Sequence, residues 1–394
     1  MNEKETQSTL PEAAEKTAKK NPLSWLRRFI KKYVPLPAFV IFCLGLLAAA
    51  VHIAACLSVT FAEWVNNGLG AGLRFLLAKL TNPLPFSVGE SLLFCLPLLL
   101  VLIVVFGIHR AKQSGTRFVR FMCAPLALVV FLYTTFVFTI GCGYRGKTLD
   151  EKLALEAKPV SVSELYSTAE ILLAETNALA VHLTQEAGGA SVMPYTYREM
   201  NEKLLAAYDT VSDKHPFLQR MRTRVKAVSV SEWMSYTHIT GVYTYMTGEA
   251  NINNVFPDYT IPFTAAHELA HQRGIARENE ANFVAFLVCT SSEDDYLRYS
   301  GYMNMLEYVT SALYSADPEA YYRLAEDYSV SIIYEMRAYR EFYKKYKDSV
   351  VGEISGSIND AYLQIQGTPG TRSYGMVVDL AVAYYRDQMA TNGE

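Results

Sequence analysis

Residues 267–271 of this 394-residue chain read His-Glu-Leu-Ala-His, and their types and spacing can do metal chemistry. Two histidines four residues apart project from one face of a helix, so both imidazoles can bind a single metal ion. The glutamate between them can reach a water molecule held by that ion and take its proton. The pentapeptide predicts one zinc ion bound by His267 and His271, with Glu268 as the catalytic base.

Zinc in a catalytic site needs a third protein ligand and one position open to water. Glu278 and Asn282 lie one turn apart at the expected start of the next helix, so they share a face. We expect Glu278 to bind the metal and Asn282 to hydrogen-bond a liganding imidazole. Glu280 remains an alternative third ligand, although two residues turn a helix by about 200° and direct it elsewhere.

The residues around the pentapeptide favour a helix with a small apolar face. Pro262 suits a first helical turn, small apolar residues follow it, and Gly274 can end the helix three residues after His271. The alternative is a core helix whose histidines are satisfied by hydrogen bonds alone. Two histidines and a glutamate would make a costly core without a metal, so we favour metal binding.

Charge divides the chain into two parts. Residues 1–142 hold 14 Lys and Arg against 6 Asp and Glu, a net +8, whereas residues 143–394 hold 22 against 33, a net −11; the sum is −3. The acidic second part argues against a nucleic-acid partner, because phosphates would be repelled. Only Cys289 of the six cysteines lies outside the apolar first part, so no disulfide framework is expected there.

Three apolar runs, near residues 35–62, 91–108 and 121–142, are each about long enough to cross a hydrocarbon core of roughly 30 Å as a helix. A buried core helix is the alternative for the second run. Basic residues set the expected orientation: the 11–34 flank and the 109–120 loop carry eleven, whereas the 63–90 loop and the stretch just after the third run carry five. We expect a multi-pass plasma-membrane protein with a cytoplasmic basic tail (1–34), a membrane domain (35–142) and an extracytoplasmic domain (143–394).

The second part reads as mainly helical with a small strand region. Apolar spacing predicts helices over 161–185, 196–209 and 216–225, then from 262 to about 347, and a last helix over 374–389. Two short strands or a hairpin are expected within 237–255, and a glycine-rich loop is expected before the last helix. The fold class expected is therefore three transmembrane helices followed by an α-rich, α+β domain.

Two resemblances follow from these motifs. His-Glu-x-x-His followed by Glu278-x-x-Ala-Asn282 resembles the gluzincin metallopeptidases, including thermolysin-like and CAAX-prenyl-protease-like enzymes, over about 20 residues. The longer stretch from Pro262 to Phe283, with Pro85–Glu90 and Arg298–Tyr302, resembles a family of bacterial multi-pass membrane proteins of unknown function. The second resemblance spans most of the chain and implies architecture but no substrate.

The gluzincin resemblance implies a zincin-like domain in which His267, His271 and Glu278 bind zinc and Glu268 is the catalytic base. The chain departs from the gluzincin pattern twice. The separation between His271 and Glu278 is short, which keeps Glu280 open as the ligand, and Asn282 stands where an aspartate is common.

The function expected is zinc-dependent hydrolysis of peptides or proteins at the outer membrane face, with the lipid bilayer as the other partner. No prediction of oligomeric state follows. Strand residues within 239–255 could pair with an extended peptide. The rival functions are a zinc-binding sensor or scaffold without proteolysis and an intramembrane protease. Candidates to stabilise the tetrahedral oxyanion, chosen by residue type, are His238, Tyr299, Tyr302 and Tyr374.

Overall fold

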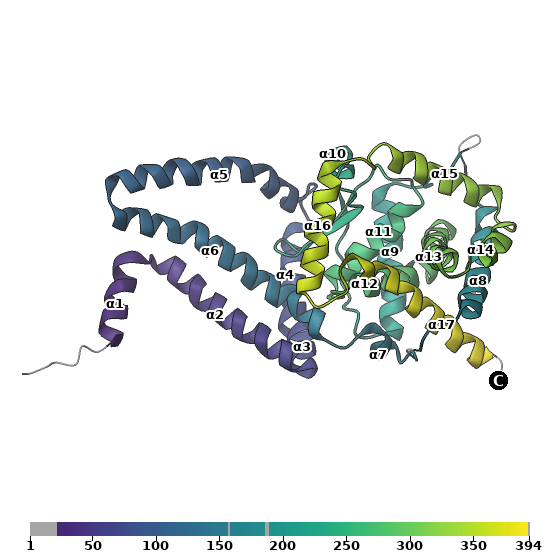
Figure 1. Cartoon of the computed structure of the whole chain (residues 1–394), viewed down its shortest axis with the longest axis horizontal. Helices are drawn as coiled ribbons and strands as arrows, with labels where there is room; N and C mark the ends of the chain where they lie inside the picture. Colours follow the sequence, from purple (N-terminus) through teal and green to yellow (C-terminus); the bar gives the residue numbers. More distant parts are fainter. Residues whose placement is uncertain (1–21, 157, 186–188, 393–394) are drawn as a thin grey trace, which may run out of the picture.

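The computed structural model describes residues 22–392, except 157 and 186–188. Three long helices extend from one side of a rounded helical domain, so the molecule is elongated (Figure 1). Most of the expected basic tail, residues 1–21, lies outside the described residues. Its last part forms helix α1 (Pro22–Tyr33).

The three long helices are α2 (Leu36–Leu57), α5 (Val88–Gln113) and α6 (Gly115–Thr139), and each is long and apolar enough to cross a membrane. The prediction of three apolar helices of membrane-spanning length is confirmed. Their bounds are shifted: α5, for example, begins at its Ser87 cap and continues through the charged residues Arg110 and Lys112. The core-helix alternative for the second run is wrong. In the most apolar 18-residue stretch of α5, only 6% is buried inside the protein.

The segment between the first two spans is helical, although we expected a loop. It comprises α3 (Val59–Val65), a π-helical turn η1 (Asn66–Gly70) and α4 (Ala71–Thr81). Its glycines hide the helical signal in the sequence, whereas tertiary contacts hold the helices in place. The buried Arg74 donates to Asn66 Oδ1 at 2.9 Å and to the carbonyl oxygen of Thr139.

The rounded domain is mainly helical, as predicted. Its α-helices are α7 (Leu149–Leu153), α8 (Val162–Ala180), α9 (Tyr197–Lys214), α10 (Ser231–Ser235), α11 (Thr260–Gln272), α12 (Glu278–Thr290), α13 (Asp295–Ala316), α14 (Pro318–Ala325), α15 (Val330–Lys344), α16 (Val350–Ile365) and α17 (Val377–Asn392). Short 3-10 helices, η2 (Gly141–Arg145) and η3 (Gly370–Met376), precede α7 and α17. Helices α11 and α12 lie side by side at the centre of the core, and every residue of α11 is buried.

A three-stranded sheet lies against α11. The strand order is β1 (Lys226–Ala227), β3 (Glu249–Ile252) and β2 (Gly241–Thr244). The central strand β3 pairs in parallel with β1 and antiparallel with β2. The predicted hairpin is thus confirmed. Strand β1 was not expected, because two residues are too few to give a strand pattern.

Two expectations for the domain are wrong. Residues 216–225 form no helix but run irregularly into β1, where the buried Asn201 side chain accepts the backbone N–H of Val225 at 2.7 Å. The apolar side chains that suggested a helix pack on the core from an irregular segment instead. Residues 350–365 form α16 instead of a loop, because Ser349 caps the helix and Gly352 fits closely against the ring of His238.

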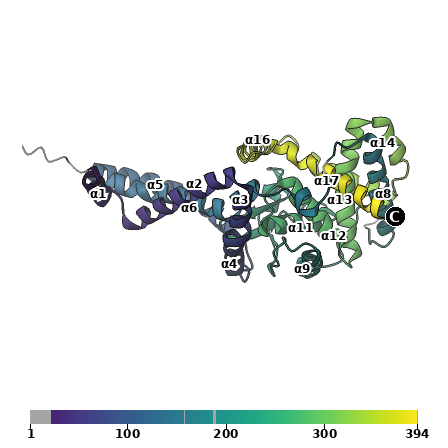
Figure 2. The same ribbon diagram turned by 90° about the horizontal axis from the view of Figure 1, so that it is seen from below.

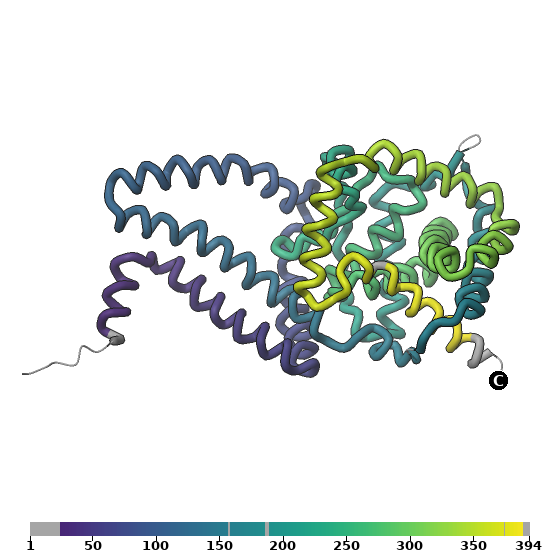
Figure 3. The backbone as a smooth tube through the Cα atoms, in the orientation of Figure 1, coloured from purple at the N-terminus to yellow at the C-terminus, as the bar shows by residue number. Residues whose placement is uncertain are grey.

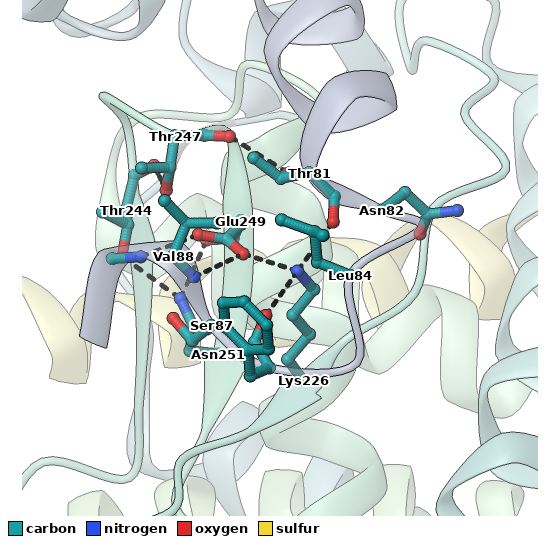
Figure 4. Close-up of polar contacts among 12 residues, drawn as sticks. Thr81, Asn82, Leu84, Ser87, Val88, Lys226, Thr244, Thr247, Glu249 and Asn251 are labelled. Carbon is teal, nitrogen blue, oxygen red and sulfur yellow. Dashed lines mark hydrogen bonds and ion pairs between the residues drawn. The ribbon is translucent and has the colours of Figure 1, made fainter. Parts of the chain in front are cut away.

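The membrane helices and the domain are joined by a buried ion pair (Figure 4). Lys226 of β1 and Glu249 of β3 approach to 2.6 Å, and both side chains are almost fully buried. The Lys226 ammonium also donates to the carbonyl oxygens of Thr81 and Phe86, and Glu249 accepts the first N–H groups of α5, from Val88 and Gly89. This clamp, defined as Lys226 with Glu249, fixes the start of α5 to the sheet.

Candidate metal centre

Helix α11 presents its two histidines to the same point. It begins at Thr260 and ends at Gln272, and Gly274 then adopts a φ of +93°, which favours glycine. The chain therefore turns back at once into α12. That short connection brings the first turn of α12 against the histidines of α11, and the imidazole rings of His267 and His271 lie 4.6 Å apart.

Three ligand atoms converge between α11 and α12. The Nε2 atoms of His267 and His271 lie 3.0 Å apart, and Glu278 Oε2 lies 3.2 Å from the first and 3.4 Å from the second. Ligand atoms around a tetrahedral zinc, with bonds of about 2.0–2.1 Å, are roughly 3.3–3.4 Å apart. The three side chains therefore already have close to the spacing that one such ion requires.

The far nitrogen of each imidazole is held by an acceptor. His267 Nδ1 lies 2.7 Å from Asn282 Oδ1, and His271 Nδ1 lies 2.7 Å from the carbonyl oxygen of Ile275. Each acceptor holds a proton on Nδ1 and so directs Nε2 toward the cluster. The Asn282 amide nitrogen in turn lies 3.2 Å from the hydroxyl of Tyr308, which fixes the amide orientation.

Glu280 faces away from this cluster. Its Oε1 accepts a hydrogen bond from Arg277 at 2.8 Å and one from the backbone N–H of Leu149 at 3.1 Å. The side chain thereby ties the start of α12 to α7. Of the two candidate carboxylates, only Glu278 converges with the histidines.

The cluster attracts a positive charge. Burial opposes protonation of His271, but the Glu278 carboxylate outweighs it and raises the pKa of His271 to about 9. Burial alone would raise the pKa of Glu278, yet the two imidazoles hold it well below its ordinary value. Without a cation the centre thus retains a proton, and a divalent ion would displace that proton on binding.

Glu268 lies beside the cluster and is 4% exposed. Burial raises its pKa to about 7, against the lowering effect of His267 and His271. The backbone N–H of Tyr243 in β2 donates to the carboxylate, while Oε2 has no hydrogen-bond partner among the described residues. A pKa near neutrality and a free oxygen suit a group that accepts and returns a proton.

A cleft of about 1240 Å³ opens over the centre. Its floor is formed by the three cluster side chains and Glu268, one wall by β2 and the residues before it, and another by α13 and α16. The cleft is lined by acidic, aromatic and apolar residues, with no lysine or arginine among its described lining residues. It is large enough for an extended stretch of polypeptide.

The three oxyanion candidates whose side chains are described do not gather at the centre. His238 lines the cleft, but its Nε2 contacts the carbonyl oxygen of Tyr346 at 2.8 Å and its Nδ1 the hydroxyl of Tyr343 at 3.4 Å. Tyr299 is fully buried in the core, and Tyr302 packs edge-on against Phe286 away from the cleft. The side chain of Tyr374 lies outside the described part of the chain.

The comparisons with known proteins place the chain in a family without giving it an activity. Residues 66–382 match the family described as "Protein of unknown function (DUF3810)". The chain belongs to this family. No curated protein and no solved structure matches the chain. The expected likeness to an uncharacterised family is thus supported, while the likeness to gluzincins stays a prediction.

This DUF3810 chain also has a polar face on α13 that sequence reasoning missed. Tyr308 touches Asn282, and Glu307 accepts a hydrogen bond from Tyr259 at 2.8 Å. Burial, with the nearby Glu335, raises the pKa of Glu307 to about 7. The sequence signal that could have revealed this face is the helical spacing of the α13 residues that line the cleft: Asn304, Glu307, Tyr308, Ser311 and Ser315.

Proposed function

We propose that this DUF3810 protein is a membrane-anchored zinc metallopeptidase with a zincin-like domain. The observation that carries the proposal is the convergence of His267 Nε2, His271 Nε2 and Glu278 Oε2 beside a buried carboxylate, Glu268, under a large cleft. A purely structural zinc site has no need of an acid between its two histidines, nor of an open side.

The residues of the centre have separate roles in this proposal. Zinc, when bound, supplies Lewis acidity that polarises the scissile carbonyl and acidifies water. His267, His271 and Glu278 hold the ion; Asn282 and the carbonyl oxygen of Ile275 orient the imidazoles. Glu268 takes the proton of the attacking water and returns it to the leaving amine.

Strand β2 is the proposed template for the substrate. It lies at the edge of the described sheet, lines the cleft, and contacts Glu268 through the Tyr243 N–H. An extended peptide can add to such an edge through main-chain hydrogen bonds. That arrangement would carry a scissile bond past Glu268 and the metal centre.

We further propose that the domain lies outside the cell and the N-terminus inside. The excess of basic residues at the N-terminal flank and in the short 109–120 loop supports this orientation in a plasma membrane. The metal centre lies in the rounded domain beyond the ends of the spans (Figure 1). This position favours cleavage outside the hydrocarbon core over intramembrane proteolysis.

The substitution Glu268→Gln tests the proposal. In the full-length protein in detergent, we expect the variant to bind zinc as the wild type does and to hydrolyse peptides about 100–10,000-fold more slowly. Glu319→Gln, an exposed position on α14, is the matched control and should change neither property. Zinc binding without hydrolysis in the wild type, or undiminished hydrolysis by Glu268→Gln, would favour a zinc-binding sensor or scaffold.

A further inference from the structure

Helix α16 exposes an apolar stripe, defined here as Val351, Ile354, Ile358 and Ile365. The four side chains are 55%, 56%, 66% and 74% exposed, and their spacing places them on one side of the helix. Polar side chains occupy the neighbouring side, about 120° around the helix: Glu353, Ser357, Asp360 and Gln364. A helix with one apolar and one polar long side is typical of a membrane surface.

The position of α16 is fixed relative to the spans. Tyr362 packs edge-on against Phe136 near the end of span α6, with ring centres 6.2 Å apart, and its hydroxyl lies 3.2 Å from that of Tyr144. Helix α16 runs across the direction of the spans, at the edge of the domain nearest to them (Figure 1). The chain then turns away along α17 to the far end of the domain (Figure 3).

Helix α4 marks the same level on the other side. Figure 2 shows α4 and α16 on opposite sides of the molecule, both next to the ends of the spans. Large apolar side chains of α4 are also exposed, with Leu76 at 53% and Leu80 at 65%. Two helices at one level, each exposing apolar side chains beside three spans, define the plane where a bilayer surface would lie.

We propose that α16 rests on the bilayer surface on the domain side, with its apolar stripe inserted among the lipids. The membrane is the occupant that the structure favours because α16 lies beside the ends of the spans, where its Tyr362 packs against Phe136 of α6.

This placement has a consequence for the cleft, which rests on the proposed function. Ile354 and Ile358 line the cleft together with Ile140, the residue that ends α6. One wall of the cleft therefore lies level with the bilayer surface. The substrate class is then a polypeptide tethered in the same membrane, cleaved in the segment just outside it.

Quenching by brominated lipid tests the position of α16. A tryptophan is introduced on the apolar stripe (Ile358→Trp) or on the polar side of the neighbouring position (Ser357→Trp), in full-length Glu268→Gln protein in phosphatidylcholine nanodiscs. After subtraction of the three native tryptophans, we expect bromination of the acyl chains to quench position 358 at least twofold more than position 357. Equal quenching at both positions, or quenching at neither, overturns the proposal.

The substrate class is tested with one fluorogenic peptide, either soluble or carrying a fatty-acyl anchor, and active enzyme in vesicles. Ile365→Asp places a charge on the stripe away from the cleft; Ser357→Asp is the control with the same charge on the polar side. We expect Ile365→Asp to lower hydrolysis of the anchored peptide at least fivefold and to leave the soluble one unchanged.

The outcomes separate the two proposals. An equal effect of Ile365→Asp on both peptides, or none on the anchored one, contradicts the membrane-tethered substrate. If the wild type cleaves neither peptide while position 358 is quenched, the peptidase proposal fails and the position of α16 stands.

Discussion

At the scale of single residues, the two nitrogens of each imidazole in the centre have different roles. Nδ1 is bound by an acceptor from the protein, and Nε2 faces Glu278. Without a cation, a proton on the imidazoles balances the Glu278 carboxylate. The proposed zinc ion would replace that proton and take the three atoms as ligands.

The Asn282 amide should contribute to metal affinity through His267. We predict that Asn282→Ala weakens zinc binding about 10–100-fold, because the imidazole loses the acceptor that fixes its orientation and proton. Competition with a fluorescent chelator measures the change. Asn279→Ala, on the same helix, is the control, and a similar effect of both substitutions would argue against the specific role of Asn282.

Glu307 should make stability depend on pH. Its pKa rises from 4.5 to about 7 on folding, so the folded protein holds a proton that the unfolded chain releases, and stability falls as pH rises from about 4.5 through 7. We predict that Glu307→Gln is more stable than the wild type at pH 8, by on the order of 1–3 kcal/mol, and equal at pH 4. Denaturant unfolding in detergent at the two pH values measures this; a gain of the same size at pH 4 would contradict it.

The sequence predicts those parts of the centre whose geometry is set by residues close together in the chain. The convergence of His267 and His271 follows from helical spacing, and the direction of Glu278 rather than Glu280 follows from the turn per residue. Tyr308 and Glu307 come from a helix that only tertiary packing brings to the cleft. His238 and Tyr299 have hydrogen-bond partners on α15 or just after it, which are likewise distant in the sequence and could not be foreseen from it.

At the scale of elements, the geometry of the centre depends on how closely β2 approaches α11. Gly241 in β2 has no side chain, and a Cβ atom there would lie 2.5 Å from Glu268 Oε1. The absence of a side chain at Gly241 therefore lets β2 approach the Glu268 carboxylate closely.

We predict that Gly241→Ala lowers peptide hydrolysis about 10–100-fold and leaves zinc content near that of the wild type, because the added methyl displaces Glu268 but touches no ligand. Zinc content and hydrolysis are measured on the same preparation. Gly72→Ala, where an added Cβ meets nothing within 4 Å, is the control and should be near wild type in both. Loss of zinc together with activity in Gly241→Ala would instead indicate a general disturbance of α11.

The elements also show where sequence patterns fail. Apolar spacing alone cannot distinguish a helix from an irregular segment packed on a core, which is why residues 216–225 were assigned wrongly. Glycines at 352 and 356 suggested a loop, but in α16 the first of them permits contact with His238. Local propensity is overridden in both places by contacts between distant segments.

At the scale of the whole molecule, the clamp joins the membrane helices to the sheet that borders the cleft. Lys226 and Glu249 are 4% and 1% exposed, and their remaining hydrogen bonds go to the α4–α5 connection and to the first turn of α5. The domain is thus held at a defined position above the spans. Composition predicted three spans and a domain, but not this junction, because its partners are about 140–160 residues apart.

We predict that Lys226→Met lowers the free energy of unfolding by about 3–5 kcal/mol, because it leaves the Glu249 carboxylate buried without its partner. Lys158→Met removes an exposed ion pair with Glu156 and should change stability by about 1 kcal/mol or less. Denaturant unfolding of the detergent-solubilised full chain compares the two. Equal effects would show that the clamp contributes no more than a surface pair.

The measurement that tests the central claim most directly is the zinc content of the purified full-length protein beside that of His271→Ala. After saturation with zinc and exhaustive dialysis, the wild type should retain about one ion per chain and the variant far less than one. A wild type that retains none, or a variant that retains as much as the wild type, would contradict the metal centre and with it the proposed hydrolase.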